Sequence, residues 1–357
     1  MALTVQIQKR WGSFLLDVDF TAENGEALAL LGASGCGKSL TLKCAAGIEK
    51  PDRGRILLNG RVLFDSARRI HLPPQSRKVG YLFQQYALFP HLTAEQNIAV
   101  ACRRDSVRRT RELMALLRLK GLEKLRPRQL SGGQQQRVAI ARILAAEPEA
   151  ILLDEPFSAL DSYLKWQLEL ELQDVLSRFP GPVLWVSHDR GEVYRNCRQV
   201  CVLENGKASP QEDIKTLMAN PGTVSAARLS GCKNYVPVQP GPEPGQVRIP
   251  LWGDLILQCA APWREGVTTL GIRANRVRPA EPGAQNAFPC EVVRVTEDVF
   301  AMLLMLRPAG AEGPLLRMEL GKDRFQAPDR DGQLWAAVQP EDLMLLEEPA
   351  SAGERQA

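Results

Sequence analysis

Short, uninterrupted runs of apolar residues recur along the first part of this chain, and each run ends at a small or polar cluster. Residues 27–31 lead into a glycine-rich segment, residues 150–153 into Asp154 and Glu155, and residues 183–186 into Ser187 and His188. Buried parallel strands have this pattern, with functional groups at the ends of the strands. Helical periodicity lies between the runs, for example over 38–48 and 133–146. The alternation predicts an α/β domain with a mostly parallel central sheet.

The pattern changes twice farther along the chain. From 95 to 128 it is helical throughout, with arginine-rich polar faces. After about residue 217, proline and glycine become frequent, and short alternating segments predict strands over 246–250, 255–259, 270–273, 291–295 and 301–306. We therefore expect a first domain over 1–225, with a helical subdomain at about 95–140, and a small, barrel-like, all-β domain over 230–348.

Composition and charge exclude several classes of protein. The chain has 357 residues, enough for one large and one small domain, and its net charge of +4 is spread along it. This weak, scattered charge argues against nucleic acid as a partner. Residues 1–10 alternate as a strand does rather than as a signal peptide, and no apolar stretch approaches the roughly 18 residues that a membrane-spanning helix needs. The eight cysteines form no CxxC pair and only three histidines are present, so we expect reduced thiols in a cytosolic protein and no zinc site.

A glycine-rich loop between an expected strand and an expected helix predicts a phosphate site. Residues 32–39 read GASGCGKS and fit the pattern GxxxxGK[ST] in that context. Glycines let backbone N–H groups turn inward around phosphates, and the following helix adds the positive end of its dipole. Lys38 is expected to reach the β- and γ-phosphates of a nucleotide, and the hydroxyl of Ser39 to ligate Mg²⁺. The nucleotide-binding residues predicted here are Gly32, Ser34, Gly35, Cys36, Gly37, Lys38, Ser39 and Leu40.

Two acids and a second glycine-rich helix start add to this site. Asp154 and Glu155 end an apolar run; we expect Asp154 to hold Mg²⁺ through water and Glu155 to polarise the attacking water. Residues 130–134 read LSGGQ, in which Ser131 fits an N-cap and the glycines expose N–H groups at a helix start, which makes a second anion site. One nucleotide does not need two such sites, but a nucleotide held between two subunits does. The residues of this second site are Ser131, Gly132, Gly133 and Gln134.

In this order and spacing, the motifs in about the first 215 residues resemble those of the nucleotide-binding subunits of ABC transporters. The resemblance implies a P-loop NTPase fold of the ABC type, ATP as substrate, Mg²⁺ as cofactor and a homodimer. It makes Gln84 the residue that senses Mg²⁺ and the attacking water, Asp161 a contact across the dimer seam, and His188 the contact of the γ-phosphate. It also implies that an N-terminal aromatic ring stacks on adenine, with Trp11 as the first candidate and Phe14 as the second. The catalytic residues are then Glu155, His188 and Gln84, and the metal site comprises Ser39, Gln84 and Asp154.

Further segments are similar to those of bacterial importers. No membrane span is fused to the nucleotide-binding part, so the permease is expected to be a separate chain, and residues 86–93 resemble the segment that contacts it. The β-rich part from about residue 230 resembles the regulatory domains of importers for oxyanions, sugars and polyamines, with 271–275 as a signature strand. The short helical insert and the segments 14–20 and 227–234 resemble the molybdate and sulfate subfamily, although 189–197 departs from the alanine-rich helix of many importers.

These resemblances imply an ATPase at the cytoplasmic face of the cell membrane that energises an importer, with molybdate as the first cargo. The implied partners are integral-membrane permease subunits and, indirectly, an extracytoplasmic substrate-binding protein, with no nucleic acid. Sulfate, a sugar or a polyamine are alternative cargos, and a soluble regulatory protein that uses ATP as a switch is the alternative from another class. A further hypothesis is that the second domain binds the transported oxyanion and inhibits transport. Lys233, Arg273 and Arg276 are the available cations, with a solvated surface position as the alternative use of each.

Overall fold

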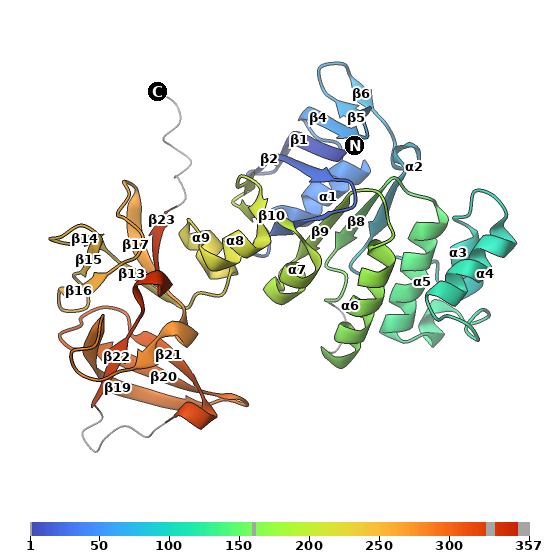
Figure 1. The fold of residues 1–357 in the computed structure, drawn as a ribbon. Helices are drawn as coiled ribbons and strands as arrows, with labels where there is room; N and C mark the ends of the chain where they lie inside the picture. Colours follow the sequence, from blue (N-terminus) through green and yellow to red (C-terminus); the bar gives the residue numbers. More distant parts are fainter. Residues whose placement is uncertain (1, 159–161, 326–332, 349–357) are drawn as a thin grey trace. The chain divides into compact units, whose positions relative to one another are not determined.

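The computed structural model describes residues 2–158, 162–325 and 333–348, and the chain divides into two compact units, 1–215 and 216–357 (Figure 1). Each unit has its own sheets and its own hydrophobic core. Among the described residues, no helix is both long and apolar enough to cross a membrane.

The first unit is built on one large, mixed sheet of 12 strands. The strands are β1 (Ala2–Trp11), β2 (Phe14–Glu23), β3 (Ala27–Leu31), β4 (Arg53–Leu58), β5 (Arg61–Asp65), β6 (Ile70–His71), β7 (Val79–Leu82), β8 (Ala150–Asp154), β9 (Val183–Ser187), β10 (Gln199–Glu204), β11 (Lys207–Ala208) and β12 (Glu212–Asp213). They lie in the order β6-β5-β4-β1-β2-β11-β10-β3-β9-β8-β7, with β12 paired to β10.

The sheet has a parallel half and an antiparallel half. The strands β10, β3, β9, β8 and β7 run parallel, and β3, β8 and β9 are almost fully buried, as their apolar runs predict. The strands β1, β2, β4, β5 and β6 pair antiparallel. The sheet is therefore less parallel than expected. Alternate side chains of β1, including Leu3, Val5 and Ile7, point into the core of this unit.

Helices cover the sheet and form a separate cluster at one end of the unit (Figure 1). The cluster consists of α3 (Ala94–Ala99), α4 (Ser106–Leu116) and α5 (Gly132–Ala145), which pack on one another, with the 3₁₀ turn η1 (Pro127–Gln129) before α5. Asn97 is fully buried and holds the segment before α3, since it accepts from the N–H of Phe89 at 2.8 Å and donates to the carbonyls of Phe89, Leu92 and Thr93. The other helices are α1 (Lys38–Ala46), α2 (Pro74–Arg77), α6 (Ser162–Leu176) and α7 (Arg190–Asn196), and α8 (Ile214–Ala219) begins at the end of this unit and continues into the second.

The second unit is mostly β-structure around a large hydrophobic core, with a smaller buried cluster that includes Val224, Ala227 and Leu346. Its sheets have the strand orders β13-β17-β23, β14-β15-β16 and β18-β22-β19-β20-β21. The side chains of Trp252 and Phe288 stack in the core of this unit. Helix α9 (Val224–Leu229) packs against β17 and β23. The strands are β13 (Asn234–Pro237), β14 (Gln239–Pro240), β15 (Gln246–Ile249), β16 (Leu255–Gln258), β17 (Val267–Ile272), β18 (Arg278–Pro279), β19 (Ala287–Glu297), β20 (Ala301–Pro308), β21 (Leu316–Gly321), β22 (Gln333–Ala337) and β23 (Leu343–Glu347), with 3₁₀ turns η2 (Ala274–Arg276), η3 (Lys322–Arg324) and η4 (Pro340–Asp342).

Candidate active site

A cavity of about 600 Å³ opens in the first unit where the loop after β3 meets the hairpin of β1 and β2. Segments far apart in the sequence contribute to its wall: the hairpin, the start of α1, the segment after β7 and the segment after β8. The lining residues are Trp11, Phe14, Ser34, Gly35, Gly37, Lys38, Ser39, Leu40, Lys43, Glu49, Gln84 and Glu155. Lys43 and Glu49 were not predicted as site residues, because neither belongs to a recognisable motif.

The loop from 32 to 37 is shaped to receive an anion. Gly37 has φ of +108°, and a Cβ there would lie 2.7 Å from Cδ1 of Leu16, so only glycine fits. The Lys38 ammonium is buried and donates to the carbonyls of Gly32 and Ala33, at 2.8 Å each. The N–H groups at the start of α1 and this ammonium together form a positive end for the cavity.

Two of the predicted phosphate-loop residues lie behind the loop and do not line the cavity. A Cβ on Gly32 would lie 2.3 Å from the carbonyl oxygen of Leu203, so this glycine allows the loop to pack on β10. Cys36 is buried and its Sγ lies 3.7 Å from the Lys38 ammonium. These two residues hold the loop in place, while Ser34, Gly35 and Gly37 face the cavity.

Oxygen ligands gather at the junction of α1 and β8. The Ser39 hydroxyl donates to Oδ1 of Asp154 at 2.9 Å, and the Tyr81 hydroxyl donates to Oδ2 at 2.8 Å. Burial, together with the adjacent Asp154 carboxylate, raises the pKa of Tyr81 and keeps it a donor. The Gln84 side chain lines the same cavity as Ser39. Sequence reasoning missed Tyr81; its signal is a hydroxyl within the apolar strand β7.

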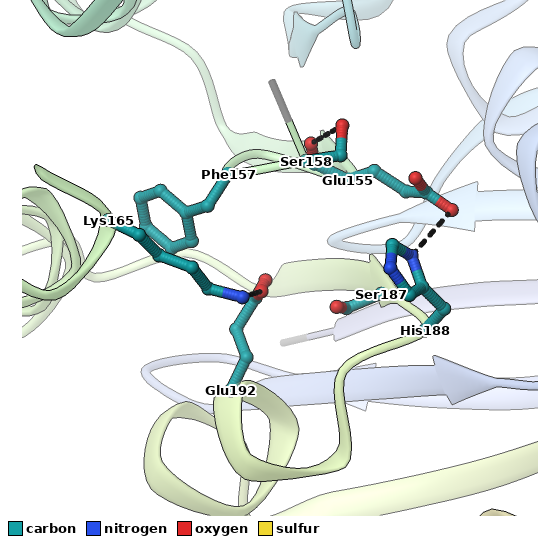
Figure 2. A pocket seen from close by; sticks show the side chains of 7 residues that line it. All are labelled: Glu155, Phe157, Ser158, Lys165, Ser187, His188 and Glu192. Atoms are coloured by element: carbon teal, nitrogen blue, oxygen red, sulfur yellow. Dashed lines mark hydrogen bonds and ion pairs between the residues drawn. The ribbon is translucent and has the colours of Figure 1, made fainter. Parts of the chain in front are cut away.

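Glu155 lines both the large cavity and a smaller one of about 210 Å³, whose lining residues Figure 2 shows. Its backbone is in the left-handed region with φ of 47°, held by its N–H bond to the Val186 carbonyl at 2.9 Å and by two bonds from Ser158 to its own carbonyl. The imidazole Nδ1 of His188 lies 3.3 Å from Oε1 of Glu155. The smaller cavity is lined by Glu155, Phe157, Ser158, Lys165, Ser187, His188 and Glu192.

The two aromatic candidates differ in their surroundings. Trp11 and Phe14 face each other across the β1–β2 hairpin, and both line the large cavity. The side chain of Trp11 is 56% exposed. Phe14 packs against the core beside Gly37. The Trp11 ring is therefore available to stack on a planar ligand, whereas the Phe14 ring fills space within the protein.

The second predicted anion site lies at the start of α5. Ser131 caps this helix: its Oγ accepts from the Gln134 N–H at 3.3 Å, and the Gln134 side chain accepts from the Ser131 N–H at 2.9 Å. None of Ser131, Gly132, Gly133 and Gln134 is among the described residues that line the large cavity. Asp161, the predicted contact across a dimer seam, lies outside the described residues.

The cations proposed for an oxyanion site in the second unit have other contacts. The Arg273 guanidinium donates to the carbonyls of Ser230 and Met218 and to the Ser230 hydroxyl. Arg276 pairs with Asp342 at 3.4 Å. These contacts argue against the use of the two arginines for an anion, and the oxyanion hypothesis stays a prediction.

Comparison with known proteins gives matches over the first unit and, for one relative, over most of the chain. A family model described as ABC transporter matches residues 15–158. The chain is 41% identical over 224 residues to the molybdenum import ATP-binding protein of Paramagnetospirillum magneticum, which covers 62% of this chain and 61% of that protein. It is 36% identical over 341 residues to the spermidine/putrescine import ATP-binding protein of Rubrobacter xylanophilus, which covers 92% of this chain and 88% of that protein. The chain thus spans about three fifths of the first relative and most of the second.

A solved structure has the same fold as the first unit. The dimeric, post-hydrolysis state of an ATP-binding cassette with bound ADP and Pi matches this chain with a TM-score of 0.51 and 28% sequence identity. The match covers 60% of this chain and 99% of the solved one.

Proposed function

This chain belongs to the ABC transporter family, and we propose that it is the ATP-hydrolysing subunit of an importer. One observation carries the proposal. A single cavity is lined by the phosphate loop, an exposed tryptophan, Gln84 and Glu155, so a nucleotide base, its phosphates and an acid for hydrolysis have matching places in one site. The two relatives, which are both import ATP-binding proteins, support the coupling of this ATPase to import.

The chemistry proposed for the site is phosphoryl transfer to water. The loop N–H groups and Lys38 bind the phosphates, and Trp11 stacks on the adenine ring. Glu155 polarises the attacking water, and His188, 3.3 Å from that carboxylate, contacts the γ-phosphate. Most of the acceleration then comes from charges fixed before the reaction starts.

The residues present also fit Mg²⁺, which the family implies. The Ser39 hydroxyl and the Asp154 carboxylate lie 2.9 Å apart, and Gln84 lines the cavity beside Ser39. These donors are all oxygens, the ligands that Mg²⁺ prefers, and they leave positions for water and phosphate oxygens. When bound, Mg²⁺ would neutralise charge on the phosphates.

A head-to-tail homodimer is part of the proposal. The LSGGQ segment forms a capped helix start, where backbone N–H groups lack partners within the helix, and none of its residues lines the large cavity of its own chain. A second copy can offer this segment to the γ-phosphate side of the site. The dimeric cassette structure with ADP and Pi supports this arrangement.

The proposed partners are integral-membrane permease subunits and, through them, an extracytoplasmic binding protein, with this subunit at the cytoplasmic face of the membrane. Residues 86–93, which Asn97 holds in place and in which Phe89 is 42% exposed, are the proposed permease contact. Molybdate is the proposed cargo, supported by the 41% identical molybdenum relative. The polyamine relative, which aligns through the second unit, makes a polyamine the alternative cargo.

The hydrolysis step is tested by Glu155→Gln. We expect steady-state hydrolysis to fall by about 10²-fold or more, while ATP binding and ATP-dependent dimerisation persist. Glu147→Gln is the matched control, because Glu147 is also a glutamate with positive φ but is exposed and outside both cavities. Normal turnover in Glu155→Gln would refute the assigned role.

The coupling and the cargo are tested in the transporter reconstituted in vesicles. Binding proteins loaded with molybdate, sulfate or putrescine are compared for stimulation of ATP hydrolysis, and molybdate is expected to stimulate most. If only the binding protein loaded with putrescine stimulates hydrolysis, putrescine would replace molybdate as the proposed cargo. An ATPase that never co-purifies with a membrane partner and responds to no binding protein would instead favour a soluble ATP-switched regulator.

A further inference from the structure

A partly buried ionic cluster lies beside His188, between α6 and α7 (Figure 2). Lys165 of α6 donates to Oδ2 of Asp189 at 2.5 Å, and its ammonium lies 3.3 Å from Oε2 of Glu192. Glu192 is 2% exposed and accepts from the indole N–H of Trp185 at 2.7 Å. Burial raises the pKa of Glu192, and the Lys165 ammonium opposes that rise. Lys165 therefore compensates a carboxylate that is costly to bury.

Asp189 controls the backbone on which His188 stands. Its Oδ1 accepts from the N–H groups of Gly191 and Glu192 at 2.8 and 3.2 Å, which caps α7. Its own N–H donates to the Ser187 hydroxyl at 3.0 Å. Both neighbours of His188 are thus fixed, and the remaining carboxylate oxygen of Asp189 is the one that Lys165 holds.

We propose that Lys165 is a positioning residue for His188. By holding Asp189, Lys165 fixes the turn from which the imidazole reaches Glu155. Lys165 lies on α6 (Ser162–Leu176), so its contact with Asp189 also joins this helix to the turn that carries His188. This inference rests on the proposed function, since it takes His188 as a contact of the γ-phosphate.

A second ionic contact between the same helices provides a matched control. Glu169, one turn farther along α6, is 2% exposed and accepts from Nε and Nη2 of Arg195 at 2.7 and 2.8 Å. It also accepts from the Asn196 amide at 2.7 Å. These contacts join α6 to α7, but the Glu169 carboxylate itself contacts neither Asp189 nor a described residue that lines the smaller cavity. A role limited to joining the helices would be shared by both contacts.

The test compares the steady-state ATPase of variants of the full chain. Lys165→Met is expected to lower kcat about tenfold while the KM for ATP changes less than about twofold, because misplacement of a reacting group affects the transition state more than binding. Lys165→Arg, which keeps a cation, is expected to restore most of kcat. Glu169→Gln is expected to lower the melting temperature and to leave kcat unchanged. A loss of kcat in Glu169→Gln equal to that in Lys165→Met would overturn the positioning role.

A double variant separates positioning from stability. Lys165→Met leaves Glu192 buried without its cation, and adding Glu192→Gln removes that charge while an amide oxygen can still accept from Trp185. The double variant is expected to regain the melting temperature of the wild type, which Lys165→Met lowers, but not its kcat. Recovery of both quantities would overturn the proposal. One set of results would overturn the positioning role alone: the wild type hydrolyses ATP, Glu155→Gln abolishes hydrolysis, and Lys165→Met has the kcat of the wild type. A wild type without ATPase activity overturns the proposed function itself.

Discussion

Replacing Arg77 by methionine is expected to destabilise the first unit by about 3 kcal/mol. Arg77 is fully buried, and its partners in the described chain are backbone carbonyls and His71 rather than carboxylates. Its Nε donates to the Leu72 carbonyl at 2.8 Å, and its Nη1 donates to the carbonyls of Cys44 and Ala45, both at 2.9 Å. Cys44 and Ala45 are in the last turn of α1, where carbonyls have no partners within the helix; the Cys44 carbonyl also accepts from the N–H of Gly47 at 3.2 Å.

The magnitude follows from these contacts. Hydrogen bonds from a charged donor each contribute about 1.5 kcal/mol net, and the variant loses three to carbonyls that stay buried. Burial lowers the pKa of Arg77 to about 10, so the charge itself is costly to bury and methionine recovers part of that cost. The free energy of unfolding is therefore expected to fall by about 3 kcal/mol. The loss includes the favourable interaction of the Arg77 cation with the negative end of the α1 dipole.

Urea unfolding followed by circular dichroism measures this loss. Arg61→Met is the control, because Arg61 also donates to backbone carbonyls, those of Ser76 and Arg77, but its side chain is 37% exposed. We expect that control to lose less than about 1 kcal/mol. A second readout is His71, whose pKa is lowered by burial and then by Arg77, so the variant should raise it. A loss below about 1 kcal/mol in Arg77→Met would refute the account of α1 capping.

Two further predictions concern the base site and the cysteines. Trp11→Ala is expected to raise the KM for ATP about tenfold with little loss of stability, whereas Phe14→Ala is expected to cost about 3 kcal/mol of stability; equal losses of stability in thermal melts would contradict the assignment. Iodoacetamide at pH 8 is expected to label the half-buried Cys102 first, detected by mass spectrometry, because burial raises the pKa of several other thiols and keeps them protonated. Burial raises the pKa to about 12 in Cys44, Cys201 and Cys290. Equally fast labelling of these three thiols in native and in urea-unfolded protein would contradict the expected order of labelling.

Local patterns predicted the elements whose signal lies within one segment. The alternating segments 246–250 and 255–259 correspond to β15 and β16, which end one residue earlier. The helix expected over 38–48 ends at Ala46, because Gly47 takes φ of +83° and a Cβ there would lie 2.4 Å from the Arg77 side chain. The antiparallel half of the large sheet was not predicted. Strand β4 begins Arg-Gly-Arg and pairs with β1, about fifty residues away, so its partner leaves no local signal.

The residues of the candidate site likewise fall into those that a local motif predicts and those that only the packing brings there. Motifs predicted the loop residues and the acids, because each motif is continuous in sequence. Lys43 and Glu49 reach the cavity only through the packing of α1, and Tyr81 reaches Asp154 only through the pairing of β7 with β8. The partners of Arg273 and Arg276 were not predicted either, because a sequence shows the cations without the groups that they contact.

The left-handed backbone of Glu155 sets stability against activity at one position. A non-glycine residue held there costs about 1 kcal/mol, which glycine would not incur. Folding alone therefore disfavours the side chain on which hydrolysis is proposed to depend, and only selection for turnover maintains it. A programme of directed evolution that ranked variants by melting temperature would select Glu155→Gly. The selected variant would lack the carboxylate on which hydrolysis is proposed to depend.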